Sequence, residues 1–572
     1  MNKSKNFILF IFLFLYIFAV RAQDIEQLKD SPSITWNGGI TWSNVFKSRN
    51  DSLQQNLQYT HYITGSLNTT IFGIISVPIS FAYTNDRLSK TITNPFNRFS
   101  FAPSWRWIKL HVGYSQMTFS SYTMVGREFM GAGIELTPYE IPWTFSAFFG
   151  RFNKASLCDS IITEPVYKRM GGGIMCGYKG ERFTLSTNVV ICKDDVNSLS
   201  FTEGVDTIYI APQGNIAGSV CATIKPSDKT TIDGEYAISI INSNCKTDTL
   251  GHVDGFWREN TDIARHTAGK LSVTQSFGNS SIGATYERVS PLYKSFASYY
   301  NTNNFENIMA NFATSILQVI TLNANVGWQH DNLNNQEINT NSQLIYSANT
   351  SIGLSEKLSF SGSVSNVQSY VHIKNILEQI TQTTQYQNLD TLSFTELSFN
   401  ASTSVNYRFG DNENFTHNVS GNYSYQKASH IQENSQQFVN NRIHNINTNY
   451  QVLYSPIKLS STLSINYNIN KTPEYEGNVL TFTASAGMPI IQKIKTNLLV
   501  NYSKINVQTN YYVLNTKLAI SYSFLNHHTL NCSITALNND SEDCKTQYTA
   551  NITYNLSLDY KAKQLSEKRK NV

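Results

Sequence analysis

Apolar and polar residues alternate one by one along much of this chain. In residues 458–470, Leu459, Leu463 and Ile465 occupy odd positions, while Ser, Thr and Asn occupy the even ones. Residues 397–409 and 549–560 repeat the pattern. Successive side chains of a β-strand point to opposite faces, so each window predicts a strand that is apolar on one side and hydrated on the other.

Alternation also occurs in soluble β-sandwiches and solenoids, and two features favour a transmembrane barrel instead. The polar face is built from Asn, Ser and Thr rather than from Lys and Glu, as expected for the wall of a water-filled lumen. Tyrosines stand near the predicted strand ends, where the membrane interface needs amphipathic rings: Tyr467, Tyr502, Tyr522 and Tyr560.

The connections between predicted strands alternate between short and long. Tight turns are expected at Gly180, 226–228, 278–279, 355–357, 410–412, 455–456, Pro489 and 526–528. Longer stretches separate them at 157–165, 194–207, 243–262, 290–303, 371–390, 427–438 and 538–545. The fold class is therefore all-β: one large antiparallel transmembrane barrel of roughly 22–26 strands, with short periplasmic turns and longer extracellular loops. Such a ring must be closed, and its lumen is water-filled, plugged by its own loops or occupied by a partner.

Composition excludes other classes. Only 15% of the 572 residues are charged, which argues against a disordered chain or a nucleic-acid binder, and a mean hydropathy of −0.28 argues against a bundle of membrane helices. Without Lys3, Lys5 and Arg21 of the leader the chain is nearly neutral, so no global field attracts polyanions or polycations.

Three segments divide the chain, and an irregular stretch lies within the second. Residues 1–22 have the form of a secretory signal peptide, with basic residues, an apolar run and small residues before the cleavage site. Residues 23–560 are predicted to form the barrel in the outer membrane of a Gram-negative bacterium. Residues 94–130 break the alternation and form either an inward-folded loop or an ordinary external one. Residues 561–572 form a basic tail, which we expect to extend into the periplasm.

Eight ionisable residues of the first half are candidates for the lumen wall, where they would tune solute selectivity or brace one another by pairing. They are Lys109, His111, Arg127, Glu135, Arg151, Lys154, Lys168 and Arg169. The chain has no nucleophile elbow, zinc-binding helix, phosphate-binding loop or dinucleotide fingerprint, so we expect no catalytic, cofactor-binding or metal residues and no cofactor.

The stretches 94–105 (NPFNRFSFAPSW), 110–136, 148–155 (FFGRFNKA) and 167–178 (YKRMGGGIMCGY) resemble a group of uncharacterised outer-membrane barrels of the Bacteroidota. The resemblance is most specific over 94–195. It implies a host phylum and an outer-membrane location, and no activity or site residue comes with it.

Three functions follow from these features. The first is a porin-like pore or transport channel for small or medium solutes. The second is a non-conducting component of an envelope machine for secretion, surface display or barrel assembly, which would dock protein partners. A barrel-embedded enzyme is the third, and we expect the protein not to be one. The expected partners are outer-membrane lipid, lipopolysaccharide and other envelope proteins, with no nucleic acid.

Overall fold

The computed structural model describes the chain from residue 33 to residue 561, with gaps. The described ranges are 33–51, 54–85, 98–156, 165–199, 210–245, 263–298, 303–317, 319–334, 342–366, 399–410, 414–431, 438–471, 476–507, 509–525, 527–540 and 546–561. The predicted signal peptide, the last eleven residues of the predicted tail and residues 94–97 lie outside the described residues.

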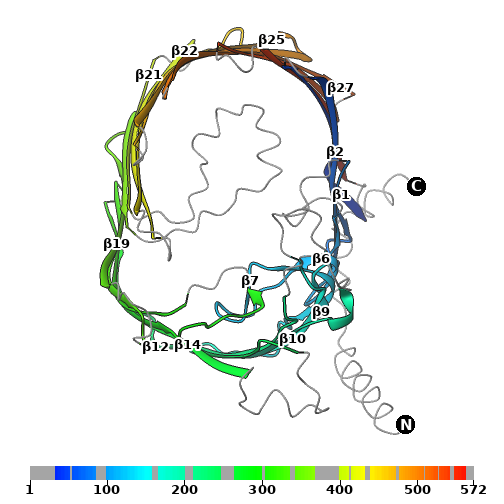
Figure 1. Cartoon of the computed structure of the whole chain (residues 1–572), viewed down its shortest axis with the longest axis vertical. Helices are drawn as coiled ribbons and strands as arrows, with labels where there is room; N and C mark the ends of the chain where they lie inside the picture. Colours follow the sequence, from blue (N-terminus) through cyan, green and yellow to red (C-terminus); the bar gives the residue numbers. More distant parts are fainter. Residues whose placement is uncertain are drawn as a thin grey trace, which may run out of the picture.

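The described strands form one closed ring (Figure 1). The first strand, β1 (Ile34–Asp51), pairs antiparallel with both β2 (Gln54–Ile71) and the last strand, β29 (Thr546–Lys561). The short strands β4 (Arg98–Phe101) and β5 (Ser104–Trp105) share one place between β3 (Ile75–Thr84) and β6 (Ile108–Gln116). Among the described residues the barrel therefore has 26 strand positions, at the upper end of the predicted range and even in number.

The other strands follow one another around the ring in chain order. In the first half they are β8 (Glu128–Leu136), β9 (Trp143–Asn153), β10 (Arg169–Lys179), β11 (Phe183–Asp194), β12 (Gly214–Ser227), β13 (Thr230–Asn242), β14 (Ile263–Phe277), β15 (Ser280–Val289), β17 (Phe305–Ile316) and β18 (Ile320–Asp331). In the second half they are β19 (Ser342–Gly353), β20 (Leu358–Ser365), β21 (Phe399–Phe409), β22 (Phe415–Ile431), β23 (Phe438–Tyr454), β24 (Leu459–Lys471), β25 (Glu476–Ile491), β26 (Ile494–Val507), β27 (Thr509–Phe524) and β28 (His528–Asn539).

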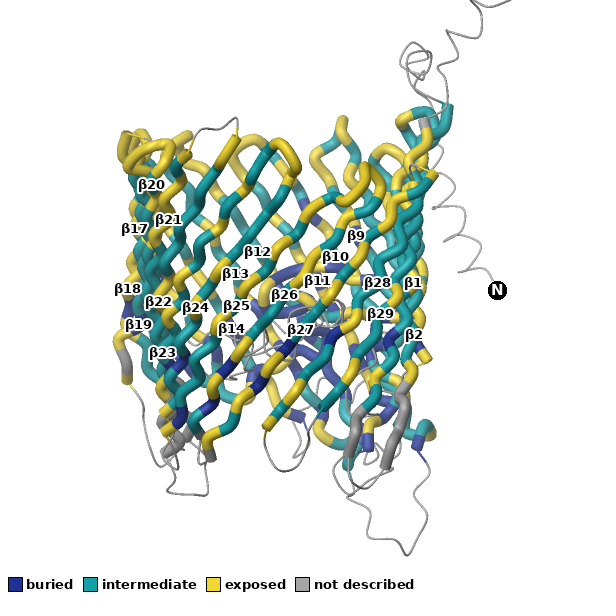
Figure 2. Tube along the Cα trace, turned by 90° about the horizontal axis from the view of Figure 1, so that it is seen from above, coloured by how far each residue is buried: buried dark blue, intermediate teal, exposed yellow. Residues whose placement is uncertain are grey.

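Each predicted alternation corresponds to a strand with two different faces. In β24, Leu463 and Ile465 are exposed on the outside of the ring, whereas Asn466 pairs across the inner face with Asn445 of β23 at 2.9 Å. Along the strands of the front wall, the burial of successive residues accordingly alternates between intermediate and exposed (Figure 2). Aqueous solvent alone would not favour so many exposed apolar side chains, and a surrounding bilayer does.

Aromatic rings form belts at both ends of the wall. At the end with the short turns, Trp36 lies 5.3 Å from Tyr560, and Trp143 lies 5.2 Å from Tyr178. At the other end Phe46, Tyr59, His61 and Tyr83 contact one another in sequence, and Tyr502 stacks on Tyr512. Two aromatic girdles around an apolar band mark the two interfaces of a membrane.

The long connections lie on one rim and face short turns on the other, as the sequence predicts, but the rim of long connections also carries two short ones, those of β1 to β2 and of β26 to β27. The turns at 180–182, 278–279, 455–458 and 492–493 belong to one rim, where β1 starts and β29 ends. By the rule for bacterial barrels this rim is periplasmic, and the rim of long connections is extracellular. The turn predicted at Pro489 is wrong by a few residues, because Pro489 lies within β25 and the chain turns at 492–493. The register shift after Pro489 accommodates a residue that has no N–H to donate.

A small second sheet lies inside the ring. Strands β7 (Met124–Val125) and β16 (Ala297–Ser298) pair in parallel, and Figure 1 shows β7 within the barrel, beside the wall that carries β10, β12 and β14. No helix of the described ranges is long and apolar enough to cross a membrane.

Candidate functional site

Two segments fold back into the barrel and dock on its inner wall. Residues 117–126 connect β6 to β8, and residues 290–298 follow β15; together we call them the inner loops. A backbone hydrogen bond from Phe119 N to Met124 O (3.0 Å) closes the first loop, and a bridge between Gly126 and Ser298 extends its pairing with the second. Residues 117–126 belong to the irregular segment 94–130. The long loop predicted over 290–303 thus leaves the extracellular rim and turns inward over 290–298.

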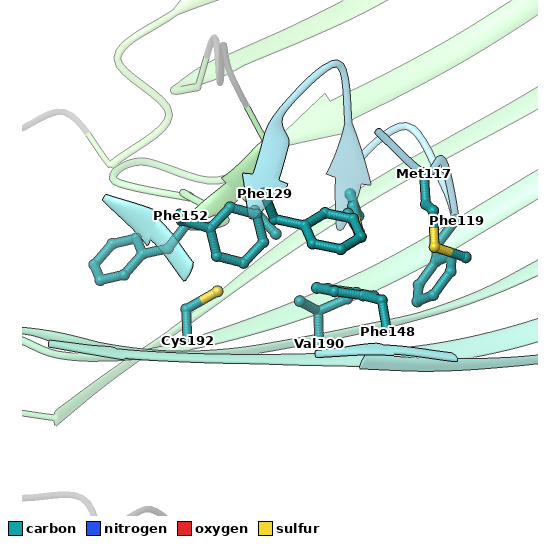
Figure 3. Packing of buried hydrophobic residues seen from close by; sticks show 10 residues of the cluster. Met117, Phe119, Phe129, Phe148, Phe152, Val190 and Cys192 are labelled. Carbon is teal, nitrogen blue, oxygen red and sulfur yellow. The ribbon is translucent and has the colours of Figure 1, made fainter. Parts of the chain in front are cut away.

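An apolar cluster fixes the inner loops to the wall (Figure 3). Phe148, Val190 and Cys192 rise from β9 and β11 toward Met117, Phe119 and Phe129, and the cluster is completed by Met124, Phe152, Phe296 and Ala297. Met124 is 0% exposed and Phe296 is 1% exposed. Burial this complete is a property of a packed core, so the inner loops are part of the folded structure of the barrel.

Small residues in the wall let a second cluster form beside the first. Ala237 of β13 and Ala268 of β14 are almost fully buried beneath Tyr122 and Tyr293. The two tyrosine rings meet edge to face with centroids 6.1 Å apart, and Tyr293 donates a hydrogen bond to the carbonyl of Tyr122 at 3.0 Å. Alanine at these wall positions leaves room for an aromatic ring on the lumen side, where a longer side chain would exclude it.

A closed ring of four buried hydrogen bonds joins the first inner loop to β11 and β12. Thr123 Oγ1 donates to Asn188 Oδ1 (2.6 Å), Asn188 Nδ2 donates to Ser219 Oγ (2.7 Å), and Ser219 Oγ donates to Ser120 Oγ (2.9 Å). Ser120 and Thr123 close the ring at 2.8 Å. All four residues are buried, and because each is satisfied, the network fixes one position of the loop on the wall.

Asn215 of β12 holds the second inner loop in the same manner. Its Oδ1 accepts from Phe296 N at 2.9 Å, and its Nδ2 donates to Ser239 Oγ at 2.7 Å. Ser239 Oγ in turn donates to the carbonyl of Lys294 at 2.6 Å. Side chains of the wall therefore bind backbone groups of a segment that has only a two-residue strand of its own.

Cations gather where the inner loops face the extracellular side. Arg169 forms a bidentate pair with Asp194 (2.7 and 2.9 Å), and its guanidinium lies 4.0 Å from the centre of the Phe296 ring. Lys294 Nζ lies 5.6 Å from the centre of the same ring. Burial lowers the pKa of Lys294, and the charges of Arg169 and Arg127 lower it further. Three positive groups, those of Arg127, Arg169 and Lys294, thus lie close enough to act on one another, and Arg169 among them is the one seen paired with Asp194 in the described residues.

Acidic groups lie on the other side of the inner loops. Tyr122 Oη donates to Glu287 Oε1 at 2.6 Å, and Tyr122 N donates to Glu235 Oε1 at 3.2 Å. Burial raises the pKa of the Tyr122 hydroxyl, and the negative charge of Glu287 adds to the shift, so the group stays a hydrogen-bond donor. Glu235 lies four residues before Ser239 on β13, which places it about 13 Å nearer the periplasmic rim.

The structure brings most of the predicted ionisable residues into pairs. Glu135 Oε1 lies 2.5 Å from His111 Nε2 and 3.4 Å from Lys109 Nζ on the inner face of β6 and β8. Lys168 lies 3.6 Å from Asp195, and Arg127 donates to Asn153 Oδ1 at 2.8 Å. These contacts and the Arg169–Asp194 pair are those expected if the ionisable residues brace one another by pairing.

Arg151 and Lys154 differ from that group. Lys154 is exposed just beyond β9 and joins none of the pairs above. Arg151 is aligned with Met130, and it donates to Met130 Sδ at 3.1 Å on the outer face of the wall. The expectation that Arg151 faces the lumen is therefore wrong. An arginine two residues from the strand end can reach the headgroup region, so the cost of a charge in hydrocarbon does not apply there.

Sequence reasoning missed Asn188, Ser219, Asn215 and Ser239, which hold the inner loops. On the sequence they are ordinary members of the polar face, and nothing in the alternation separates a buried Asn from a hydrated one. The nearest signal is the presence of small residues on the same inner face, Ala217 of β12 and Ala237 of β13, since small side chains leave space above a wall. Within the described ranges, no three His, Cys, Asp or Glu side chains gather into a metal site.

The similarity of this chain to known proteins is low. No protein-family model and no curated protein sequence matches the chain. Among solved structures, OccAB4 of Acinetobacter baumannii aligns over 92% of this chain and 99% of that chain at 8% identity, with a TM-score of 0.31. The siderophore receptor PirA of Pseudomonas aeruginosa aligns over 91% and 80% at 8% identity, with a TM-score of 0.40. The translocation pore of the P pilus usher PapC aligns over 91% and 99% at 11% identity, with a TM-score of 0.28.

These likenesses concern the fold only. The protein is a large β-barrel of the outer-membrane kind, and its membrane-facing band and girdles agree with that class. The resemblance to a Bacteroidota group and the signal peptide stay predictions.

Proposed function

We propose that this protein is an outer-membrane channel for small or medium polar solutes, in which the inner loops narrow the lumen from one side. Support comes first from width, because a closed barrel of this many strands encloses more space than its own inward side chains fill. The anchored inner loops then occupy part of that space. A loop held in one position by a packed core and closed hydrogen-bond networks gives a passage of fixed shape.

The observation that carries this proposal is the contrast around the ring. The inner loops cover the wall near β9–β15, while the inner faces of β20–β29 carry rows of Ser, Thr and Asn. Some of these residues bond across strands, as Ser361 does with Ser404 and Ser363 with Ser402, both at 2.6 Å. A wall of small, uncharged, hydrogen-bonding groups suits the passage of hydrated solutes without binding them tightly.

The charged residues near the inner loops give this passage a preference for solutes of one charge. A solute entering from the extracellular side meets Arg127, Arg169 and Lys294 before it reaches Glu235 and Glu287, which contact Tyr122. Lys294 forms no acidic pair within the described residues. We expect the entrance side of the constriction to favour anions and the exit side to reduce that preference.

The test is reconstitution of the folded barrel in planar lipid bilayers. We expect discrete conductance steps and a modest anion preference in a salt gradient. A folded, inserted protein that stays silent in the bilayer would overturn the channel and would favour the non-conducting envelope component. Insertion is checked separately, by flotation with vesicles and by the heat-dependent shift of a folded barrel on a denaturing gel.

A further inference from the structure

The outer surface of the wall carries an apolar groove over β8–β11. Its volume is about 700 Å³, and its outward-facing lining includes Ala132, Ile134, Ala147, Phe149, Gly172 and Ile174. Val189 and Ile191 of β11 border it on one side. Phe149 is 64% exposed and Ile174 is 56% exposed, so large side chains stand up around a floor of small ones.

Strand register explains the groove. One row across the outer face places Ala132, Phe149, Gly172 and Ile191 side by side, and the next row places Ile134, Ala147, Ile174 and Val189. Each small residue is flanked by a large one in its own row or the adjacent row. A depression between large side chains gives an acyl chain close contact on several sides, and each added contact contributes dispersion attraction that a flat surface does not supply.

Two cations lie directly above the groove. The next row toward the extracellular rim places Met130, Arg151, Met170 and Lys193 side by side, two residues or about 7 Å from the row of Gly172. Neither Arg151 nor Lys193 has an acidic partner in the part of the chain that the structure describes. In the same row, Met130 is aligned with Tyr114 of β6, a girdle residue that Arg98 covers at 5.4 Å.

The position of the groove and the two cations relative to the bilayer determines which molecule the site can bind. The groove lies on the band of the wall that faces hydrocarbon, so its occupant presents an apolar chain. The cations lie at the extracellular girdle, where lipid headgroups begin, so the same occupant presents an anion there. Arginine and lysine at that level match phosphate groups, which arginine can bind with two hydrogen bonds.

We propose that β8–β11 form a specific binding site for one phosphorylated, acylated lipid of the outer leaflet, of the lipopolysaccharide kind. One acyl chain lies in the groove over Ala132, Ala147 and Gly172, and a phosphate lies against Arg151 and Lys193. The site is independent of the channel, because its residues point away from the lumen. It also lies on the reverse side of the strands that carry the apolar cluster of the inner loops.

The experiment uses the full barrel, purified in mild detergent and mixed with lipid A as the probe, followed by native mass spectrometry. We expect one lipid A molecule to remain bound to the native protein. In Arg151→Gln with Lys193→Gln, and separately in Ala132→Phe with Ala147→Phe, the retained fraction should fall about fivefold or more. The second pair keeps the surface apolar and fills only the groove.

Matched controls make the same number of changes elsewhere on the outer face. Ala284→Phe with Ala310→Phe places the same rings on two aligned, exposed alanines of β15 and β17, and Lys427→Gln with Arg442→Gln removes two aligned outer-face cations of β22 and β23. Both controls should retain lipid A as the native protein does. Equal loss in test and control variants would overturn the site, and so would equal retention of lipid A from which the phosphates have been removed. Each variant is first shown to be folded by its heat-dependent gel shift.

Discussion

The two halves of this barrel share one pattern of alternation and use it differently. Around β20–β29 the inner face carries Ser, Thr and Asn that bond to neighbouring strands, such as Asn466 with Asn445. Around β9–β15 the inner face carries Phe148, Val190 and Ala237, and the inner loops cover it. The outer faces of both halves are apolar. Contact with lipid therefore determines the residues of the outer face around the whole ring. Contact with the inner loops determines the residues of the inner face in one half only.

This difference shows what a lumen-facing position can do. A polar residue facing water is replaceable by another small polar residue, because solvent satisfies it. A polar residue beneath a docked loop is part of a buried network, and its loss leaves partners unsatisfied. The same residue type, asparagine, therefore has different energetic importance at Asn188 and at Asn449.

The largest effect is expected from removing the first inner loop. Replacing residues 119–125 by two glycines leaves β6 and β8 paired from Ile108↔Leu136 to Gln116↔Glu128, so the barrel should still close. Because the loop then no longer occupies the lumen, single-channel conductance in planar bilayers should rise by roughly half or more. An unchanged conductance in a folded variant would show that the inner loops do not limit the passage.

A smaller effect is expected from a cavity beneath the loop. Met124→Ala removes a fully buried side chain, which typically costs about 2–5 kcal/mol. Because the barrel strands are paired independently of the loop, that loss should appear as faster hydrogen exchange at 117–126 rather than as unfolding of the wall. The matched control is Met488→Ala, whose side chain is 41% exposed on the outer face, and exchange at the inner loops should not respond to it.

The hydrogen-bond ring gives the next prediction. Asn188→Ala leaves Thr123 and Ser219 without their buried partner, at an expected cost of about 1–3 kcal/mol to docking of the loop. Asn449→Ala, on the inner face of the opposite half, should change stability by about 0.5 kcal/mol or less. Hydrogen exchange at residues 117–126 measures both. Equal effects of the two substitutions would remove the distinction drawn here between the two halves.

The sequence was sufficient for the half that faces only water and lipid. Alternation over 397–409, 458–470 and 549–560 predicted β21, β24 and β29, and the alternating connections predicted the number of strands and the separation of short and long connections. Those features repeat along the chain, and each strand needs information only about its own two faces.

The half that carries the inner loops was less predictable. Segment 94–130 was recognisable as irregular, but inward and external loops have the same composition. The burial of Asn188 depends on the loop at 117–126, and the burial of Asn215 depends on the loop that follows 290, so both positions are decided by segments far away in the chain. Arg151 shows a similar limit on the outer side, because Phe148 and Phe149 are adjacent and the local sequence does not tell which face of β9 is the apolar outer one. Contacts between distant segments decide these positions, and a local pattern does not encode them.

The smallest effect concerns Lys294, at the side of the constriction nearest the extracellular rim. Because burial and two guanidinium groups lower its pKa, it loses its proton at a lower pH than an exposed lysine, and the anion preference of the channel should decline in the alkaline range below the ordinary lysine value. The same shift determines how stability changes with pH. The unfolded chain binds this proton more tightly than the folded chain does, so docking of the second inner loop gains stability as pH rises through that range.

Lys294→Gln should shift the reversal potential toward cations at neutral pH and remove this pH response, whereas Lys294→Arg should keep the anion preference up to high pH. Reversal potentials in a salt gradient, measured from neutral to alkaline pH, decide the matter, and a titration that persists in Lys294→Gln would assign it to another group.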